Sequence, residues 1–230
     1  MTNQYEYVTR REYSPINQDF QQIINQVHKE MKQYDITFQH ELIGSGSRRL
    51  VTRISGGNTG YDFDYNLNIQ QFPAEFSPKK IKNLFRESFR HALKNSKYKD
   101  PEDSTSVLTI KMVDFENSRI SHSFDMALTF RFEDGEKYIR NNKNGSYTWE
   151  CRKSKVFNQE LVEEIKDFYV DGWGLVYEEY LYLKNNNRDP NKHSYNLYVE
   201  AVNNVHHKMR QHPEYRDWKN QRELEDDYDE

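Results

Sequence analysis

Residues 61–69 read YDFDYNLNI, an unbroken alternation of apolar and polar side chains. Successive side chains of a β-strand point to opposite faces, so this period of two predicts a strand with one face in a core. Asp62 and Asp64 then share the polar face, about 6.6 Å apart along the chain. Because two carboxylates held so closely repel each other, the pair indicates that a cation or a proton relieves them.

The segments after this strand predict more of the same unit. Ser77-Pro78 is a helix-start signal, because serine can cap a helix and proline fits its first turn. Paired strands are expected at Val107–Phe115 and Ile120–Phe132, and a hairpin at Lys137–Arg140 and Tyr147–Cys151 with Asn144-Gly145 as its turn.

The segment before residue 61 predicts a helix, a strand and a turn. The first dozen residues are polar and are expected to be loosely held, and Ser14-Pro15 predicts the start of a helix that runs to about Gln33. Ile36–Ile43 has the pattern of a strand. A short helix is predicted from Ser47 to about Ile54, followed by the flexible loop SGGNTG.

Helical patterning dominates after Arg152. Helices are predicted from Asn158 to about Leu183 and from Tyr195 to about Met209, and the last eight residues include six acids, which predicts a disordered tail. We therefore expect an α+β fold, a mixed β-sheet flanked by helices with a helical C-terminal part. Its expected divisions are a core with an N-terminal helix over 1–152, a helical part over 153–212 and an acidic, disordered tail over 213–230.

Composition excludes several classes of protein. The chain has 230 residues, of which 14% are aromatic, and this aromatic content argues against a disordered chain. No apolar run is long enough to span a membrane, and a single cysteine, Cys151, excludes an internal disulfide framework and a clustered zinc site. We expect a cytoplasmic protein. The net charge of −4 provides no overall field toward nucleic acid.

A third carboxylate, Asp125, lies in the later strand pattern, between apolar Phe124 and Met126. If that strand neighbours residues 61–69, the three acids converge. Mg²⁺ prefers such hard oxygen ligands, and three carboxylates can hold two metal ions of the kind used in phosphoryl chemistry. Taken alone, Asp-x-Asp on a strand is more often a solvated face.

The turn Gly44-Ser45-Gly46-Ser47 precedes these acids. Its glycines allow close backbone approach to a ligand, and Arg48 adds a cationic group, so the turn is a candidate anion site. No Gly-Lys-Ser/Thr follows, which excludes a Walker loop. A plain Gly-Ser loop is the alternative for this tetrapeptide alone.

Together these motifs resemble the signature of the DNA polymerase beta-like nucleotidyltransferase superfamily. The signature consists of Gly46-Ser47, then Thr52, then Asp62-Phe63-Asp64, then a strand-borne Asp125. The pattern is most similar to the cyclic-oligonucleotide synthase and oligoadenylate synthetase branch and covers roughly residues 36–132. Val51 stands where that branch usually has glycine, and Gly44-Ser45 is a second possible register of the turn.

The resemblance implies a role for each matching residue. Gly46 and Ser47 would hold the β- and γ-phosphates of a nucleoside triphosphate, with Arg48 and Thr52 in the same nucleotide-binding segment. Asp62 and Asp64 would bind two Mg²⁺ (or Mn²⁺) ions. Asp125 would complete the second metal site and help deprotonate an acceptor hydroxyl.

The expected activity is transfer of a nucleoside monophosphate from a triphosphate to a hydroxyl, with release of pyrophosphate. The acceptor is open: a nucleotide, a small molecule, a protein side chain or RNA. The alternative function is a catalytically silent module that binds nucleotide or RNA.

The helix expected after Ser77 offers a basic face that nucleic acid could contact. A solvated face is favoured, because Glu87 and Asp100 lie close by. The basic residues are Lys79, Lys80, Lys82, Arg86, Arg90 and Lys94.

Overall fold

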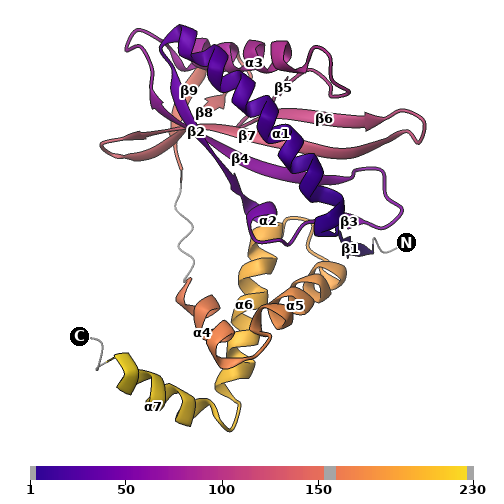
Figure 1. The fold of residues 1–230 in the computed structure, drawn as a ribbon, viewed down its shortest axis with the longest axis vertical. Coiled ribbons are helices and arrows are strands. Elements are labelled where there is room, and N and C mark those ends of the chain that lie inside the picture. Colours follow the sequence, from indigo (N-terminus) through magenta and orange to yellow (C-terminus); the bar gives the residue numbers. More distant parts are fainter. Residues whose placement is uncertain (1–3, 153–158, 227–230) are drawn as a thin grey trace. The chain divides into compact units, whose positions relative to one another are not determined.

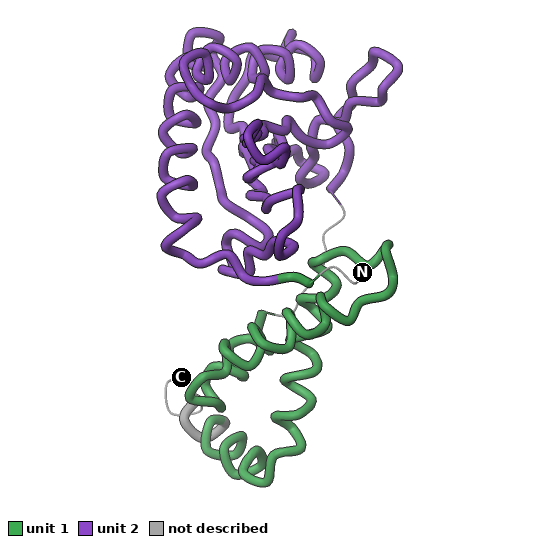
Figure 2. Tube along the Cα trace, turned by 90° about the vertical axis from the view of Figure 1, so that its right-hand side faces the viewer, with its two compact units in different colours: residues 1–5, 155–230 green, residues 6–154 purple. Residues whose placement is uncertain are grey.

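A computed structural model describes residues 4–152 and 159–226 of the chain. These residues form two compact units, 6–152 in one and 4–5 with 159–226 in the other, which Figure 2 shows in different colours. The helices of the first unit are α1 (Arg10–Met31), the 3-10 turn η1 (Lys32–Tyr34), α2 (Gly44–Ser47) and α3 (Pro78–Leu93). Its strands are β1 (Tyr5–Tyr7), β2 (Thr37–Ile43), β3 (Thr52–Ile54), β4 (Tyr61–Gln71), β5 (Glu102–Asp103), β6 (Leu108–Asp114), β7 (Arg119–Phe132), β8 (Gly135–Asn141) and β9 (Tyr147–Cys151).

The sheet is mixed, as the sequence predicts. Strands lie in the order β2-β4-β7-β6-β5, with β8 paired to the end of β7 and β9 paired to β8. Only β4 and β7 run parallel; the other pairs are antiparallel. The α+β class and the predicted β6–β7 and β8–β9 pairs are confirmed.

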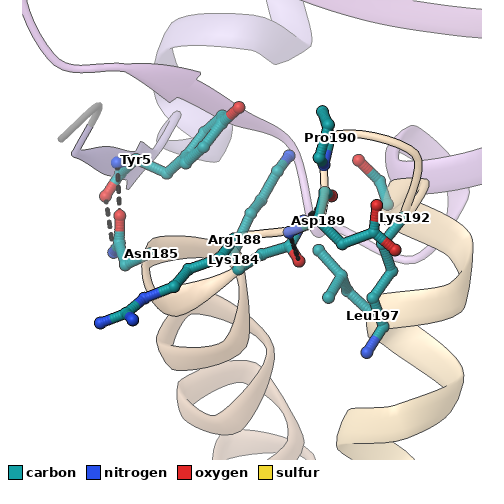
Figure 3. A pocket seen from close by; sticks show the side chains of 10 residues that line it. Tyr5, Lys184, Asn185, Arg188, Asp189, Pro190, Lys192 and Leu197 are labelled. Carbon is teal, nitrogen blue, oxygen red and sulfur yellow. Dashed lines mark hydrogen bonds between the residues drawn. The ribbon is translucent and has the colours of Figure 1, made fainter.

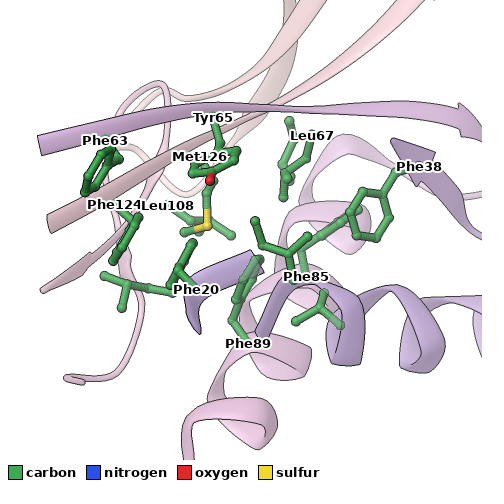
Figure 4. Packing of buried hydrophobic residues seen from close by; sticks show 14 of the residues in the cluster. Phe20, Phe38, Phe63, Tyr65, Leu67, Phe85, Phe89, Leu108, Phe124 and Met126 are labelled. Carbon is green, nitrogen blue, oxygen red and sulfur yellow. The ribbon is translucent and has the colours of Figure 1, made fainter. Parts of the chain in front are cut away.

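Helices α1 and α3 cover one face of this sheet (Figure 1). The apolar face of β4 and the core face of β7 meet them in an aromatic core, shown in Figure 4. Phe20 of α1 stacks on Phe124 of β7 with ring centroids 3.6 Å apart, and Phe63 stacks on the same ring at 5.2 Å. Because this face holds the apolar side chains, the polar residues of β4 lie on the opposite face of the sheet.

The N-terminal segment differs from the prediction. Residues 5–7 form β1, and α1 begins at Arg10 with Thr9 as its N-cap, whose Oγ1 accepts a hydrogen bond from the Glu12 N–H at 3.3 Å. Pro15 therefore lies inside the helix. The helix begins before the proline because Tyr13 is buried with the other apolar residues of α1. This packing outweighs the loss of the one backbone hydrogen bond that Pro15 cannot donate.

The predicted helix from Ser47 to Ile54 is also wrong. The helical turn comes earlier, as α2, and Thr52 begins strand β3, which pairs with β1. Arg49 has a φ of +61°, a left-handed conformation that ends a helix. A partner strand far away in sequence, which local pattern does not reveal, makes the β3 segment extended.

The second unit contains α4 (Glu160–Phe168), α5 (Gly172–Asn186), α6 (Ser194–Arg210) and α7 (Tyr215–Asp226). The single helix predicted over 158–183 is divided, because Asp171 caps α5 by accepting a hydrogen bond from the Gly174 N–H at 3.0 Å. Gly172 packs so closely on α4 that a Cβ would lie 2.2 Å from the Ile165 carbonyl oxygen. The predicted helix start at Asn158 lies outside the described residues.

In the second unit, side-chain contacts involve both its first residues, at Tyr5, and its last helix, α7. The Asn185 side chain pairs with the Tyr5 backbone: the Tyr5 N–H donates to Oδ1 at 2.6 Å, and Nδ2 donates to the Tyr5 carbonyl at 3.2 Å (Figure 3). The predicted disorder of residues 213–230 is wrong for α7, because Trp218 packs on Phe168 at 5.3 Å. Residues 227–230 lie outside the described part of the chain.

Among the described residues, no helix combines the length and the apolar character that a bilayer span requires.

Candidate nucleotidyltransfer site

The three predicted acids lie on one face of the sheet. Asp64 and Asp125 are Cα partners across the parallel β4–β7 pair, and Asp62 is the partner of Ser123, one step earlier on that face. Adjacent strands are about 4.8 Å apart, so this register places the Asp64 and Asp125 side chains next to each other. The predicted convergence of these residues on neighbouring strands is therefore present in the fold.

The pKa values of Asp64 and Asp125 reflect the crowding of these carboxylates. Burial, then the charges of Asp125 and Asp62, raise the pKa of Asp64 from 3.8 to about 6. Burial and the charge of Asp62 raise the pKa of Asp125, while a hydrogen bond from Thr109 opposes the rise. Two nearby guanidiniums, Arg152 and Arg48, partly offset the repulsion at Asp64. Such a site stabilises protons or cations placed among its carboxylates.

The carboxylates are held by neighbours on the same face. The Ser123 hydroxyl donates to Asp62, and the Thr109 hydroxyl donates to Asp125 at 2.5 Å. Within the described residues, no group of three or more His, Cys, Asp or Glu side chains is already arranged to hold a metal ion. The donor set suits Mg²⁺ in kind, because it consists of hard oxygens that repel one another, and its role as a metal site stays a prediction.

The glycine-serine turn lies against the acids. Strand β2 ends at Ile43, the partner of Asp64, and the chain turns immediately at Gly44 with a φ of +68°. A Cβ on Gly44 would lie 2.6 Å from the Asp64 Oδ2 atom, so any other residue at this position would displace this carboxylate. The turn and the acids thus form one site.

The predicted nucleotide-binding residues lie in two elements or at their ends. Gly46 and Ser47 belong to α2, Arg48 follows it, and Thr52 belongs to β3. The Ser47 hydroxyl and the Arg48 guanidinium both donate to the Gly44 carbonyl, at 3.0 and 2.9 Å. Gly46 is buried, and a Cβ on it would lie 3.0 Å from Leu42 and 3.2 Å from Phe63. Gly44, from the second possible register, is therefore the glycine beside Asp64. Thr52 lies in β3, and its role stays a prediction.

Two residues that the sequence reasoning did not select belong to this face. Arg152 donates through Nη1 to the Asn66 Oδ1 at 2.9 Å and forms an ion pair with Glu136 at 3.0 Å. Asn66 is two residues beyond Asp64 in the alternating strand, so its position on the polar face could be predicted. No local pattern indicates Arg152, because its approach to Asp64 depends on the pairing of β7, β8 and β9.

Most of the basic residues of α3 are engaged within the protein. Lys82 is 1% exposed and forms an ion pair with Asp103 at 2.8 Å, so its prediction as part of a solvated or nucleic-acid-binding face is wrong. Its burial is tolerated because the Ser104 carbonyl also accepts from Nζ, at 3.0 Å. Arg90 is paired with Glu87 and Asp100.

Several solved structures with a similar fold are cyclic-dinucleotide synthases. The DncV cyclic AMP-GMP synthase of Vibrio cholerae, solved with nonhydrolyzable GTP, matches with a TM-score of 0.51 and 15% identity over 74% of this chain and 46% of its own. The STING-associated CdnE c-di-GMP synthase of Capnocytophaga granulosa matches with a TM-score of 0.53 and 15% identity over 86% of this chain and 61% of its own. No protein-family model and no curated protein sequence matches.

These matches confirm the fold that the sequence resemblance implies. The chain has the nucleotidyltransferase-like fold of the cyclic-dinucleotide synthases. It spans about half the length of DncV. At this level of identity the likeness establishes the architecture alone.

Proposed function

We propose that this protein is a metal-dependent nucleotidyltransferase that moves a nucleoside monophosphate from a triphosphate to a hydroxyl acceptor and releases pyrophosphate. The observation that carries the proposal is the β4–β7 register, which pairs Asp64 with Asp125 beside the Gly44 turn. Support also comes from the fold, which DncV shares in a structure solved with a nonhydrolyzable GTP.

Each residue of the site has a role in this proposal. Asp62, Asp64 and Asp125 would hold Mg²⁺ or Mn²⁺, which would neutralise triphosphate charge and activate the attacking oxygen. The turn with Gly46 and Ser47 would orient the phosphates, and Arg48 would add positive charge beside them. Such transfer depends on alignment and charge stabilisation more than on covalent chemistry by the protein.

The test incubates the protein with each nucleoside triphosphate and Mg²⁺ or Mn²⁺ and follows pyrophosphate and new products by mass spectrometry. We expect Asp64→Asn to lower turnover by a factor of about 10³ or more, because it removes a metal ligand at the reacting centre. Asp134→Asn, in the turn before β8, is the matched control and should keep wild-type turnover.

Turnover by a folded Asp64→Asn variant equal to that of the wild type would remove this assignment. Nucleotide binding without turnover, with every triphosphate and both metals, would instead favour the catalytically silent alternative.

A further inference from the structure

Thr109 lies on the face of the sheet that carries the acids, although its strand contributes no carboxylate to them. It stands in β6 between the buried residues Leu108 and Ile110, so the alternation of the strand turns its side chain to the polar face. Its Cα partner across the antiparallel β6–β7 pair is Asp125. Cross-strand partners have Cβ atoms about 5 Å apart, which brings the Thr109 hydroxyl within reach of the Asp125 carboxylate.

The direction of the hydrogen bond between these two side chains follows from their chemistry. The Thr109 hydroxyl lies 2.5 Å from the Asp125 Oδ1 atom. An ionised carboxylate can only accept hydrogen bonds, so the single hydroxyl proton of Thr109 points to Asp125. Such a charge-assisted bond is stronger than one between neutral groups. Because threonine is β-branched, its restricted χ1 rotation keeps this donor aimed in one direction.

A second hydroxyl supports Thr109 from the turn that precedes β6. The Ser104 Oγ atom lies 3.5 Å from Thr109 Oγ1, and because the Thr109 proton is already used, Ser104 is the donor in this longer contact. The Ser104 backbone is fixed at both ends: its N–H donates to the Val107 carbonyl at 3.0 Å, and its carbonyl accepts from the buried Lys82 Nζ at 3.0 Å. Lys82 therefore anchors to α3 the turn that places the donor of Asp125.

We propose that Thr109 is a positioning residue that orients Asp125 for metal binding, so that removal of its hydroxyl lowers both the metal affinity of the site and the rate of transfer. The inference rests on the proposed function for the identity of the bound group. A fixed donor on Oδ1 limits rotation of the Asp125 carboxylate and leaves Oδ2 for a cation. Partners that orient metal ligands in this way typically contribute a factor of about 10 to 100 in metal affinity or activity.

The test measures metal binding apart from turnover. Mn²⁺ is titrated into the full chain without nucleotide, and free Mn²⁺ is followed by electron paramagnetic resonance. Thr109→Val keeps the shape of the side chain and removes the hydroxyl, so it should weaken Mn²⁺ binding by about 10- to 100-fold. Thr109→Ser keeps the hydroxyl and should restore most of the affinity. Thr148→Val is the matched control, because this exposed threonine of β9 also donates to a carboxylate, that of Glu150 at 3.2 Å, and the variant should bind like the wild type.

A double variant separates positioning of Asp125 from a general structural role of Thr109. In an Asp125→Asn background, Thr109→Val should have little further effect on Mn²⁺ affinity, because the carboxylate that it orients is gone. Thr109→Ala removes the same hydroxyl and should give the same loss, so the result does not depend on the folding of one variant. Where the wild type turns over, kcat should fall in Thr109→Val and recover in Thr109→Ser.

Four results would overturn the inference: unchanged Mn²⁺ affinity in Thr109→Val and Thr109→Ala, an equal loss in Thr109→Ser, a full further loss in the Asp125→Asn background, or no saturable Mn²⁺ binding by the wild type. Failure of the proposed function is read separately, from the absence of pyrophosphate release by the wild type with every triphosphate.

Discussion

Asp64 combines burial with two neighbouring carboxylates, and this combination has a cost for the folded chain. A pKa raised from 3.8 to about 6 means that the native state keeps a proton that the unfolded chain has lost. Unfolding free energy therefore falls as the pH rises between about 4 and 6, and the loss persists above that range. The candidate catalytic side chain opposes folding unless a cation accompanies it.

We expect Asp64→Asn to stabilise the metal-free protein at about pH 7, by at most about 3 kcal/mol, and to leave its stability near pH 4 unchanged. Urea unfolding in EDTA across this pH range measures the effect, with Asp35→Asn, at an exposed carboxyl outside the site, as the control. If the unfolding free energy of wild type and Asp64→Asn had the same pH dependence, the assignment of this destabilisation to the Asp64 carboxyl would be wrong.

At the scale of elements, strand β2 and the turn α2 hold the glycine-serine segment against β4. The positive φ of Gly44 and its contact with Asp64 are separate reasons for glycine, and the chain provides a comparison that separates them. Gly56 has nearly the same φ, +67° against +68°, but nothing within 4 Å of the position its Cβ would take.

Gly44→Ala should therefore destabilise the protein more than Gly56→Ala, which carries only the backbone cost of about 1–2 kcal/mol. Gly44→Ala should also abolish turnover, because its Cβ displaces the Asp64 carboxylate, while Gly56→Ala stays active. Urea unfolding and the pyrophosphate assay check both statements. Equal losses of stability in the two variants would show that the contact with Asp64 has no effect.

For the whole molecule, we expect that a divalent cation held by Asp62, Asp64 and Asp125, as the proposed function requires, also stabilises the folded state. A ligand present at about 100 times its Kd stabilises the native state by about 2.7 kcal/mol. Mg²⁺ should raise the Tm more at about pH 7.5 than at about pH 5, because a proton at Asp64 competes with the metal at the lower pH.

Differential scanning fluorimetry with MgCl₂ against NaCl of equal ionic strength makes this measurement. The double variant Asp62→Asn/Asp64→Asn should lose the Mg²⁺ effect. A Tm shift that this variant retains would place the bound metal elsewhere in the protein.

The sequence by itself determined the parts of the fold that depend on neighbours along the chain. Alternation in residues 61–69 placed Asp62 and Asp64 on one face, and Ser77 caps α3 as its pattern with Pro78 predicts. Period and capping are local properties, since each follows from the geometry of a few consecutive residues. The same signals failed at Pro15, where burial of Tyr13 outweighed them, and at residues 47–54, where pairing of β3 with β1 did.

Only the tertiary structure decided which strands pair and in which register. It joined β4 to β7 in parallel, so that Asp125, more than sixty residues away in sequence, lies beside Asp64. It also brought Arg152 to Asn66 and buried Lys82 on Asp103. Pairing between distant segments depends on the packing of all elements around one core, and no short stretch of sequence contains that information.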